Sequence, residues 1–243
     1  MRAQSRATAL HCPRFDSRLG PNEQKVPAIR APNGSVVYFV PGELGSGALW
    51  EIDFALSGNG EIGDGAGLTN VDHVATGLPV EELDTWILFY RAVLGMVPGE
   101  SLELSDPFGL IRSSGVASAN RSVRAVLNVS QSQSTVTAKT ISLSGGASVH
   151  HIAFACSDIF ATMGRMVAGG ARFVAVSDNY YDDLAARFAL PEAQVARMRE
   201  LGVLYERTAG GEYFHAYTEA FADRFFSEIC LCLFILPLFG NQI

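Results

Sequence analysis

Apolar positions in the middle of the chain follow two periods, the two-residue alternation of a strand and the 3.6-residue period of a helix. The order of strand and helix patterns occurs twice. A short apolar strand around His73 precedes Glu81–Leu94, whose apolar residues fall on one helical face. Gly95 is placed to end this helix. The Ser-, Thr- and Gly-rich stretch 130–148 predicts a loop. The strands predicted between helix and loop are 101–104, 109–114 and 122–129.

A second copy of this order starts at Ser148–Cys156, a strand with two adjacent histidines. Ser157 or Asp158 can cap the helix that comes next, and Gly169–Gly170 can end it. The repeated βαβββ order predicts an α+β fold of two paired modules. The remaining elements predicted in this copy are a strand at 171–176, two helices within 179–201 divided at Pro191, and strands at 203–207, 213–218 and 224–229.

The segment before the repeat has a different character. Residues 1–25 show no clear periodicity, whereas 34–40 and 49–54 are predicted to be strands joined by a turn. Two strands do not fold alone, so they must belong to a larger unit or pack onto the repeated modules.

Charge and composition narrow the classes of function. The 243 residues include 18 basic and 25 acidic ones, and the net charge of −7 argues against nucleic acid or an anionic membrane as a partner. A hydrophobic content of 48% with 24 glycines is typical of a globular, strand-rich protein. The four cysteines have no CxxC spacing and are expected to be reduced thiols of a cytoplasmic protein. The apolar run 230–239 is too short for a membrane span, and residues 1–6 lack the apolar core of an export signal.

Each of the two repeated strands carries a histidine among small or β-branched residues. Alternation along a strand places His151 on an apolar face and His150 on the opposite face. If the two copies pack around a shared axis, His73 and His151 meet at one point. Two neutral imidazoles and one carboxylate, with open coordination positions, describe a non-haem Fe(II) site. Each histidine alone could equally be a core or surface residue, and His150 is expected to be a surface or packing residue.

A carboxylate that could complete such a site lies in an otherwise apolar strand. This is Glu228 in Arg224–Ile229, and because an unpaired buried charge is costly, Glu228 requires a strong partner. The partner is either a metal ion shared with His73 and His151 or an arginine such as Arg224.

Several motifs on these elements are specific in combination. One set is Val71–Val74, Val149–Phe154, Ser177–Asp182 and Phe225–Ile229; a second set is Phe89–Gly95, Asp106–Ser113, Leu127–Ser130 and Ala222–Phe226. The first set resembles the 4-hydroxyphenylpyruvate dioxygenase family of the vicinal-oxygen-chelate superfamily. The second set is similar to the dioxygenase-like C-terminal half of bacterial two-domain 3-dehydroshikimate dehydratases. The resemblance runs from about Ala9 to Ile229.

The resemblance implies a vicinal-oxygen-chelate fold, in which paired modules curl one sheet around a metal ion. It implies that His73, His151 and Glu228 hold this metal, with Fe(II) expected first and Co, Mn or Mg as alternatives. Asn128 and His215 are the candidates for contact with a small aromatic or shikimate-type acid. The dioxygenases have a glutamine in the strand that carries His215, so His215 either lines the cavity or packs in the core.

Two functions are implied by the resemblance. The first is Fe(II)-dependent oxidative decarboxylation of an aromatic 2-oxo acid, as in the dioxygenases. The second is a non-catalytic, metal-binding module of a dehydratase in quinate and shikimate catabolism, without the lyase barrel of those proteins. The intact triad favours the first function. His215 favours the second, as does the sequence after Glu228, which lacks the family's Gln, Arg and Gly-rich continuation. Self-association into a homo-oligomer stays open.

The expected division of the chain has four parts. Residues 1–56 are a remnant of a preceding vicinal-oxygen-chelate domain, 57–68 a linker, and 69–229 the dioxygenase-like domain. Residues 230–243 form an apolar tail that departs from the family, and the run 230–239 is expected to be exposed or badly packed.

Overall fold

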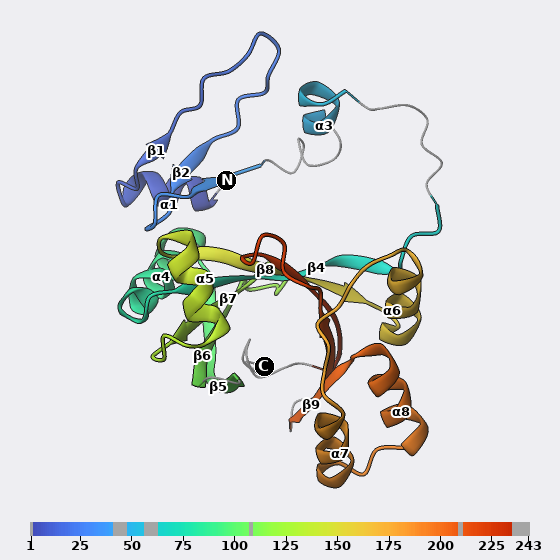
Figure 1. Ribbon diagram of the computed structural model, residues 1–243. Coiled ribbons are helices and arrows are strands. Elements are labelled where there is room, and N and C mark those ends of the chain that lie inside the picture. Colours follow the sequence, from blue (N-terminus) through green and yellow to red (C-terminus); the bar gives the residue numbers. More distant parts are fainter. Residues whose placement is uncertain (1, 41–47, 56–62, 107–108, 209–210, 235–243) are drawn as a thin grey trace. The chain divides into compact units, whose positions relative to one another are not determined.

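The computed structural model describes residues 2–40, 48–55, 63–106, 109–208 and 211–234 (Figure 1). The chain forms two compact units, Met1–Gly63 with Asp84–Val97, and Asp64–Leu83 with Pro98–Ile243. No helix within the described ranges is long and apolar enough to cross a membrane.

The first unit contains a small sheet and short helices. These are α1 (Arg2–Ala9), β1 (Arg14–Phe15), β2 (Ala28–Arg30), β3 (Val36–Tyr38), α3 (Ala48–Asp53), most of α4 (Leu83–Phe89) and the π-helical η2 (Tyr90–Leu94). The strands pair antiparallel in the order β1-β2-β3. Ala7, Ile29 and Val93 share a small buried core. The helix predicted at 81–94 is therefore present, and it ends at Gly95 in the left-handed conformation.

One prediction for this unit is wrong, and one helix has no signal in the sequence. Segment 49–54 lies in helix α3 and its C-terminal flank instead of a strand. Six residues are too few to distinguish the two periods, and Ala48, Leu49 and Glu51 all favour helix. Helix α1 has no apolar face to detect because only Ala7 of its residues is buried.

The second unit begins with the strands of the first βαβββ module, whose helix, α4 with η2, is counted in the first unit. Its elements are β4 (Leu68–Leu78), the 3-10 turn η1 (Val80–Glu82), β5 (Val97–Asp106), β6 (Gly109–Ala117), β7 (Arg124–Ser130) and α5 (Val136–Ser144). The three predicted strands are confirmed. The loop predicted at 130–148 is wrong in part, because it contains α5. Thr135 caps this helix by accepting a hydrogen bond from the Ala138 amide at 3.1 Å. Its buried side chains are Thr137 and Thr140, so hydrophobic periodicity does not reveal it.

The second module repeats the order with two added helices. Its elements are β8 (Ser148–Cys156), α6 (Ile159–Ala168), α7 (Asp178–Arg187), α8 (Glu192–Leu201), β9 (Leu204–Thr208), β10 (Gly211–Tyr217) and β11 (Phe226–Phe234). Asp158 caps α6 as predicted. The strand predicted at 171–176 is wrong, because Phe173 makes only an isolated bridge to Thr218, just beyond the end of β10.

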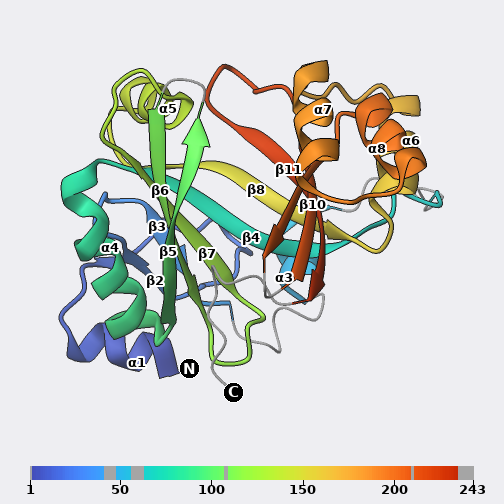
Figure 2. The same ribbon diagram turned by 90° about the horizontal axis from the view of Figure 1, so that it is seen from below.

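The eight strands form one curled, mixed sheet in the order β5-β6-β7-β4-β8-β11-β10-β9 (Figure 2). In each module the first strand pairs parallel with the last, β4 with β7 and β8 with β11. The modules meet through the antiparallel pair of β4 and β8. The same strand pairing in both modules confirms the predicted α+β fold of paired βαβββ modules.

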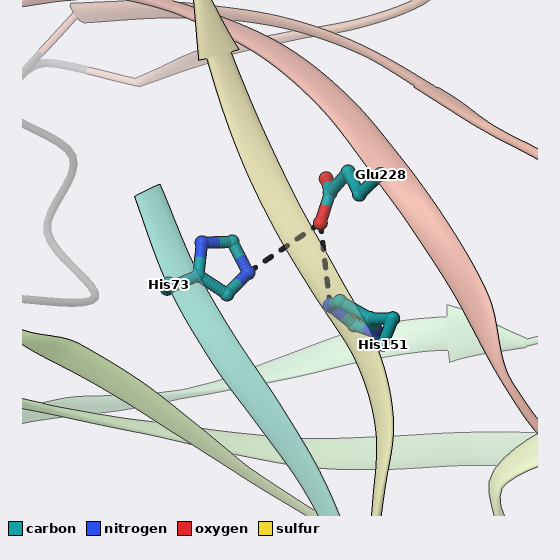
Figure 3. A group of neighbouring side chains, drawn as sticks. All are labelled: His73, His151 and Glu228. Atoms are coloured by element: carbon teal, nitrogen blue, oxygen red, sulfur yellow. Dashed lines mark ion pairs between the residues drawn. The ribbon is translucent and has the colours of Figure 1, made fainter. Parts of the chain in front are cut away.

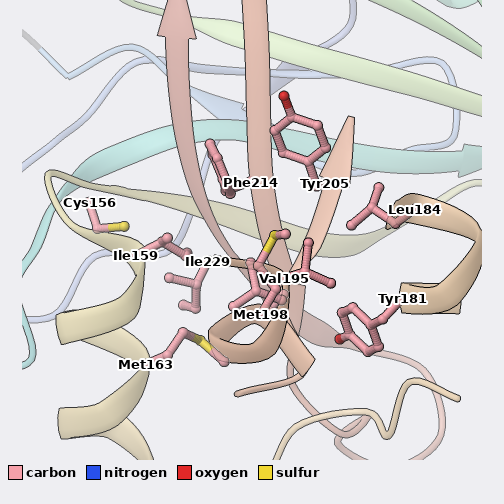
Figure 4. Close-up of a cluster of buried hydrophobic side chains, with 12 residues drawn as sticks. Cys156, Ile159, Met163, Tyr181, Leu184, Val195, Met198, Tyr205, Phe214 and Ile229 are labelled. Carbon is pink, nitrogen blue, oxygen red and sulfur yellow. The ribbon is translucent and has the colours of Figure 1, made fainter. Parts of the chain in front are cut away.

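Helices α6, α7 and α8 gather on one side of β10 and β11 (Figures 1 and 2). Their core includes Phe214, Ala216 and Ile229, together with Met163 and Met198 from the helices (Figure 4). Because strand side chains alternate, Tyr213, His215 and Tyr217 on β10 and Glu228 on β11 point to the other face.

Strand β11 continues past Glu228 into the predicted tail. Residues 230–234 pair with β10, from Cys230 opposite His215 to Phe234 opposite Gly211. Cys230 is fully buried, and Leu231 and Cys232 are half-buried. The expectation of an exposed or badly packed run is therefore wrong for Cys230–Cys232. Residues 235–243 lie outside the described ranges.

Candidate metal centre

Three neighbouring strands of the second unit bring His73, His151 and Glu228 together. His73 on β4 and Glu228 on β11 both pair with Ala153 on β8, the strand that lies between them. The methyl side chain of Ala153 leaves room for the longer side chains on either side. His151 lies two residues before Ala153, on the same face of β8. All three side chains are buried, although imidazole and carboxylate groups are rarely buried without a partner.

The two imidazole rings both face one carboxylate oxygen of Glu228 (Figure 3). Glu228 Oε2 lies 3.4 Å from His73 Nε2 and 3.3 Å from His151 Nε2. The ligand atoms of the three residues all lie within 4.8 Å of one another. Sequence analysis predicted this convergence, and the structure places the three residues together.

These residues fit a divalent metal ion. The buried Nε2 of His151 makes no hydrogen bond, although a carboxylate oxygen lies 3.3 Å away. A metal ion at this point would satisfy that nitrogen and bridge the three groups. Two imidazoles and one carboxylate are the donor set of open Fe(II) sites, and they also accept other first-row divalent ions.

Charge in the cluster is divided between His73 and Glu228. Burial disfavours the imidazolium of His73, but hydrogen bonds with Asp72 and Glu228 outweigh it and raise the pKa to about 9. Burial also disfavours the Glu228 carboxylate, but contacts with His151, His215 and His73 hold its pKa well below the usual range. Burial lowers the pKa of His151, so its imidazole is neutral at pH 7.

A β-bulge precedes His73. The pairing of β4 with β8 shifts by one residue between Val71 and His73, and the extra residue is Asp72. As a result Asp72 turns toward its neighbour, and His73 Nδ1 donates to Asp72 Oδ1 at 2.8 Å. Arg124 holds Asp72 through its guanidinium group. Sequence analysis missed both residues, although an aspartate directly before a buried histidine is a detectable signal.

A second bulge corrects the interpretation of His150. Ala75 pairs with His151 and Thr76 with Val149, so His150 is the extra residue. The bulge cancels the alternation, and the Nδ1 atoms of His150 and His151 lie 2.9 Å apart. His150 is thus buried beside the cluster. Of the two expected roles, the surface position is wrong and the packing role agrees with its burial, but its ring lies next to His151 and does not point away from it. Burial holds the pKa of His150 well below its ordinary value.

The second oxygen of Glu228 has protein partners of its own. Tyr213 donates its hydroxyl to Glu228 Oε1 at 2.9 Å, and His215 Nδ1 lies 3.2 Å from the same oxygen. His215 therefore contacts the cluster instead of packing only in the core. Arg224 is exposed, and within the described residues the ion-pair contacts of Glu228 are with His73, His151 and His215. The alternative of an ion pair with Arg224 is wrong.

The other substrate candidate, Asn128, lies on β7 in the same unit. Its Nδ2 is 3.2 Å from His150 Nε2, whereas its buried Oδ1 has no hydrogen-bond partner.

The curled sheet and the His-His-Glu cluster define a class of proteins built from paired βαβββ modules around a potential metal centre. The family model described as "Glyoxalase/Bleomycin resistance protein/Dioxygenase superfamily" matches residues 70–231. The chain belongs to this superfamily.

Within this superfamily, the chain is similar in sequence to two kinds of curated relatives. The chain is 42% identical over 228 residues to a 3-dehydroshikimate dehydratase of Pseudomonas putida, covering 93% of this chain and 36% of that protein. It is 23% identical over 210 residues to a 4-hydroxyphenylpyruvate dioxygenase of Pseudomonas aeruginosa, covering 85% of this chain and 58% of the relative. This chain therefore spans about a third of the dehydratase and little more than half of the dioxygenase.

Solved structures agree with this placement. A "xylose isomerase-like TIM barrel/4-hydroxyphenylpyruvate dioxygenase fusion protein" matches 95% of this chain with 38% identity and a TM-score of 0.76, over 36% of its own length. A mutant of 4-hydroxymandelate synthase from Streptomyces coelicolor shares the fold, with 19% identity, a TM-score of 0.76, and coverage of 99% of this chain and 68% of its own.

Proposed function

We propose that this chain binds one divalent metal ion through His73, His151 and Glu228, and that the ion is Fe(II). The observation that carries the proposal is the convergence of two imidazole nitrogens on one carboxylate oxygen in a buried site. Co(II), Mn(II) and Mg(II) are the alternative ions. Mg(II) prefers oxygen ligands, so two imidazoles favour the others.

The first candidate activity is oxidative chemistry on an aromatic 2-oxo acid, as the name of the dioxygenase relatives suggests. Bound Fe(II) would supply Lewis-acid and one-electron chemistry for the reaction of such an acid with O2. Glu228 would neutralise one positive charge of the ion through Oε2. Tyr213 and His215 hold its Oε1, so the carboxylate keeps a fixed orientation.

Residues beyond the ligands would recognise the acid. His215 and Asn128 are the proposed contacts. The unpartnered Oδ1 of Asn128 supports this role because a buried amide without a partner is ready to accept a hydrogen bond.

The second candidate is a metal-binding module of a longer, dehydratase-like protein. The 42% identity to 3-dehydroshikimate dehydratase supports it. In that case the metal site would serve stability or association, and a shikimate-type acid would be processed elsewhere in the longer protein. The thiols of Cys12, Cys156 and Cys230 support a cytoplasmic location.

Two assays separate the candidates. Metal-free protein is titrated with Fe(II), Co(II), Mn(II) and Mg(II) without oxygen, and we expect about one ion to bind per chain. The Fe(II) form is then supplied with 4-hydroxyphenylpyruvate, and O2 uptake is recorded. O2 uptake coupled to decarboxylation supports the dioxygenase activity. Metal binding without turnover supports the module. We expect no protocatechuate from 3-dehydroshikimate with this chain alone, and its formation would contradict both assignments.

A further inference from the structure

Three buried side chains form a line that ends at the proposed metal ligand His151. His150 Nδ1 lies 2.9 Å from His151 Nδ1, and His150 Nε2 lies 3.2 Å from the amide of Asn128. Gly77 on β4 makes the space for His150: a methyl group there would lie 3.1 Å from His150 Cδ2 and 3.2 Å from Ile141 Cγ1. The His150 side chain is therefore closely packed against the backbone at Gly77.

Hydrogen bonding along this line has only two directions. Two nitrogens 2.9 Å apart share one proton, so either His150 or His151 is the donor. If His151 accepts at Nδ1, its own proton sits on Nε2 and blocks that atom as a metal ligand. If His151 donates from Nδ1, its Nε2 lone pair is available and His150 must accept.

The second direction also fixes the far end of the line. A neutral His150 that accepts at Nδ1 carries its proton on Nε2, and this proton requires an acceptor. Asn128 offers one through its amide oxygen. A half turn of the amide exchanges its oxygen and nitrogen, and the Oδ1 that now has no partner would take the position facing His150.

We propose that His150 and Asn128 are positioning residues that hold His151 in its Nδ1–H tautomer and so present Nε2 to the metal ion. The inference rests on the proposed metal site and deepens it. After the half turn the Asn128 oxygen faces His150, so the Nδ2 group is left for the substrate contact proposed above.

The first module contains a device of the same kind with different chemistry. There Asp72, also an extra residue in a bulge, accepts from His73 Nδ1 and is held by Arg124. The two ligand histidines are thus each oriented by the residue directly before them. Orienting partners of this type commonly change metal affinity by about 10- to 100-fold.

The test compares Co(II) affinity and the Co(II) absorption spectrum across matched variants. His150→Leu removes the acceptor, and Asn128→Leu removes the end of the line; each is expected to weaken binding about tenfold or more. His150→Asn places an amide oxygen near the position of Nδ1 and is expected to restore most of the affinity. Tyr181→Phe, which removes a buried hydroxyl without a hydrogen-bond partner in the core behind the sheet, is the control and should bind like wild type.

A second readout needs no variant. In the Zn(II)-loaded wild-type protein, long-range 1H–15N NMR correlations report which ring nitrogen carries the proton. We expect the proton on Nδ1 of His151 and on Nε2 of His150. A proton on Nδ1 of His150, or unchanged Co(II) affinity in folded His150→Leu, would overturn the positioning role. Absence of Co(II) binding by wild type, or binding unaffected by Glu228→Ala, would instead overturn the proposed metal site.

Discussion

His73 and His151 occupy equivalent positions in the two modules, yet their neighbours give them different charges. His73 faces Asp72, whose negative charge helps to raise its pKa to about 9. His151 faces a second imidazole, and burial lowers its pKa. One ligand is therefore expected to exchange a proton for the metal ion, whereas the other is neutral before the metal arrives.

Alanine at the three proposed ligands is the first residue-scale prediction. His73→Ala, His151→Ala and Glu228→Ala are each expected to lower metal affinity by more than about tenfold, measured by calorimetric titration. Arg224→Ala is the matched control for Glu228, because Arg224 is exposed in the turn just before β11 and lies outside the cluster. Equal losses from Arg224→Ala and Glu228→Ala would remove the basis for the site.

The charge on His73 predicts how stability depends on pH in the metal-free protein. Its pKa is 6.5 ordinarily and about 9 in the fold, so the folded chain holds a proton that the unfolded chain releases. The stabilisation is complete below pH 6.5 and is lost as the pH rises to about 9, an effect of at most about 3 kcal/mol. Urea unfolding at several pH values measures it. The loss should be smaller in His73→Gln, and an identical slope in that variant would contradict the assignment.

At the scale of elements, the β-bulges decide what sequence reasoning could and could not find. The repeat predicted that His73 and His151 would meet, because strand and helix periods recur in the same order. Strict alternation also predicted that His150 would point away. The extra residue in β8 reverses that outcome, and no residue type in Val149–His151 announces a bulge.

Helix α5 was not predicted from the sequence, and the contribution of its N-cap, Thr135, to stability can be tested. Thr135→Ala is expected to lower the free energy of unfolding by about 1 kcal/mol, because the Ala138 amide loses its acceptor. Chemical denaturation measures the change. Ser134→Ala, at an exposed neighbouring position, should leave stability within about 0.5 kcal/mol of wild type. A similar loss in both variants would show that the cap itself is not responsible.

At the scale of the whole molecule, the cluster joins the two modules. His73 comes from the first module, whereas His151 and Glu228 come from the second. This pairing could be predicted from the repeat, since its elements are long and periodic. In the first 63 residues the strand predicted at 34–40 is present as β3, whereas α1, β1, β2 and α3 could not be predicted because they are short.

A ligand set shared by two modules predicts stabilisation by metal. At a free metal concentration of about 100 times the Kd, binding adds about 2.7 kcal/mol, which corresponds to roughly 5–10 °C in Tm for a chain of this size. Differential scanning calorimetry with and without Co(II) measures the shift, and a chelator should reverse it. Glu228→Ala should show little shift; a full shift in that variant would mean that the ion binds elsewhere.

Strands β7 and β11 occupy equivalent places in the two modules, but their side chains differ. Glu228 pairs with Ala153, two residues beyond His151; the corresponding residue in β7 is Val126, which pairs with Ala75, two residues beyond His73. One copy thus supplies an anion where the other supplies only a buried isopropyl group. Val126→Glu would give the centre four protein donors, and closed donor sets are typical of structural ions, not reactive ones. We expect that variant to bind Co(II) more tightly. We also expect a 2-oxo acid to change the Co(II) absorption spectrum of the wild type but not that of the variant. The apolar side chain of Val126 would then be what keeps a coordination position of the metal open for substrate, where a glutamate would close it.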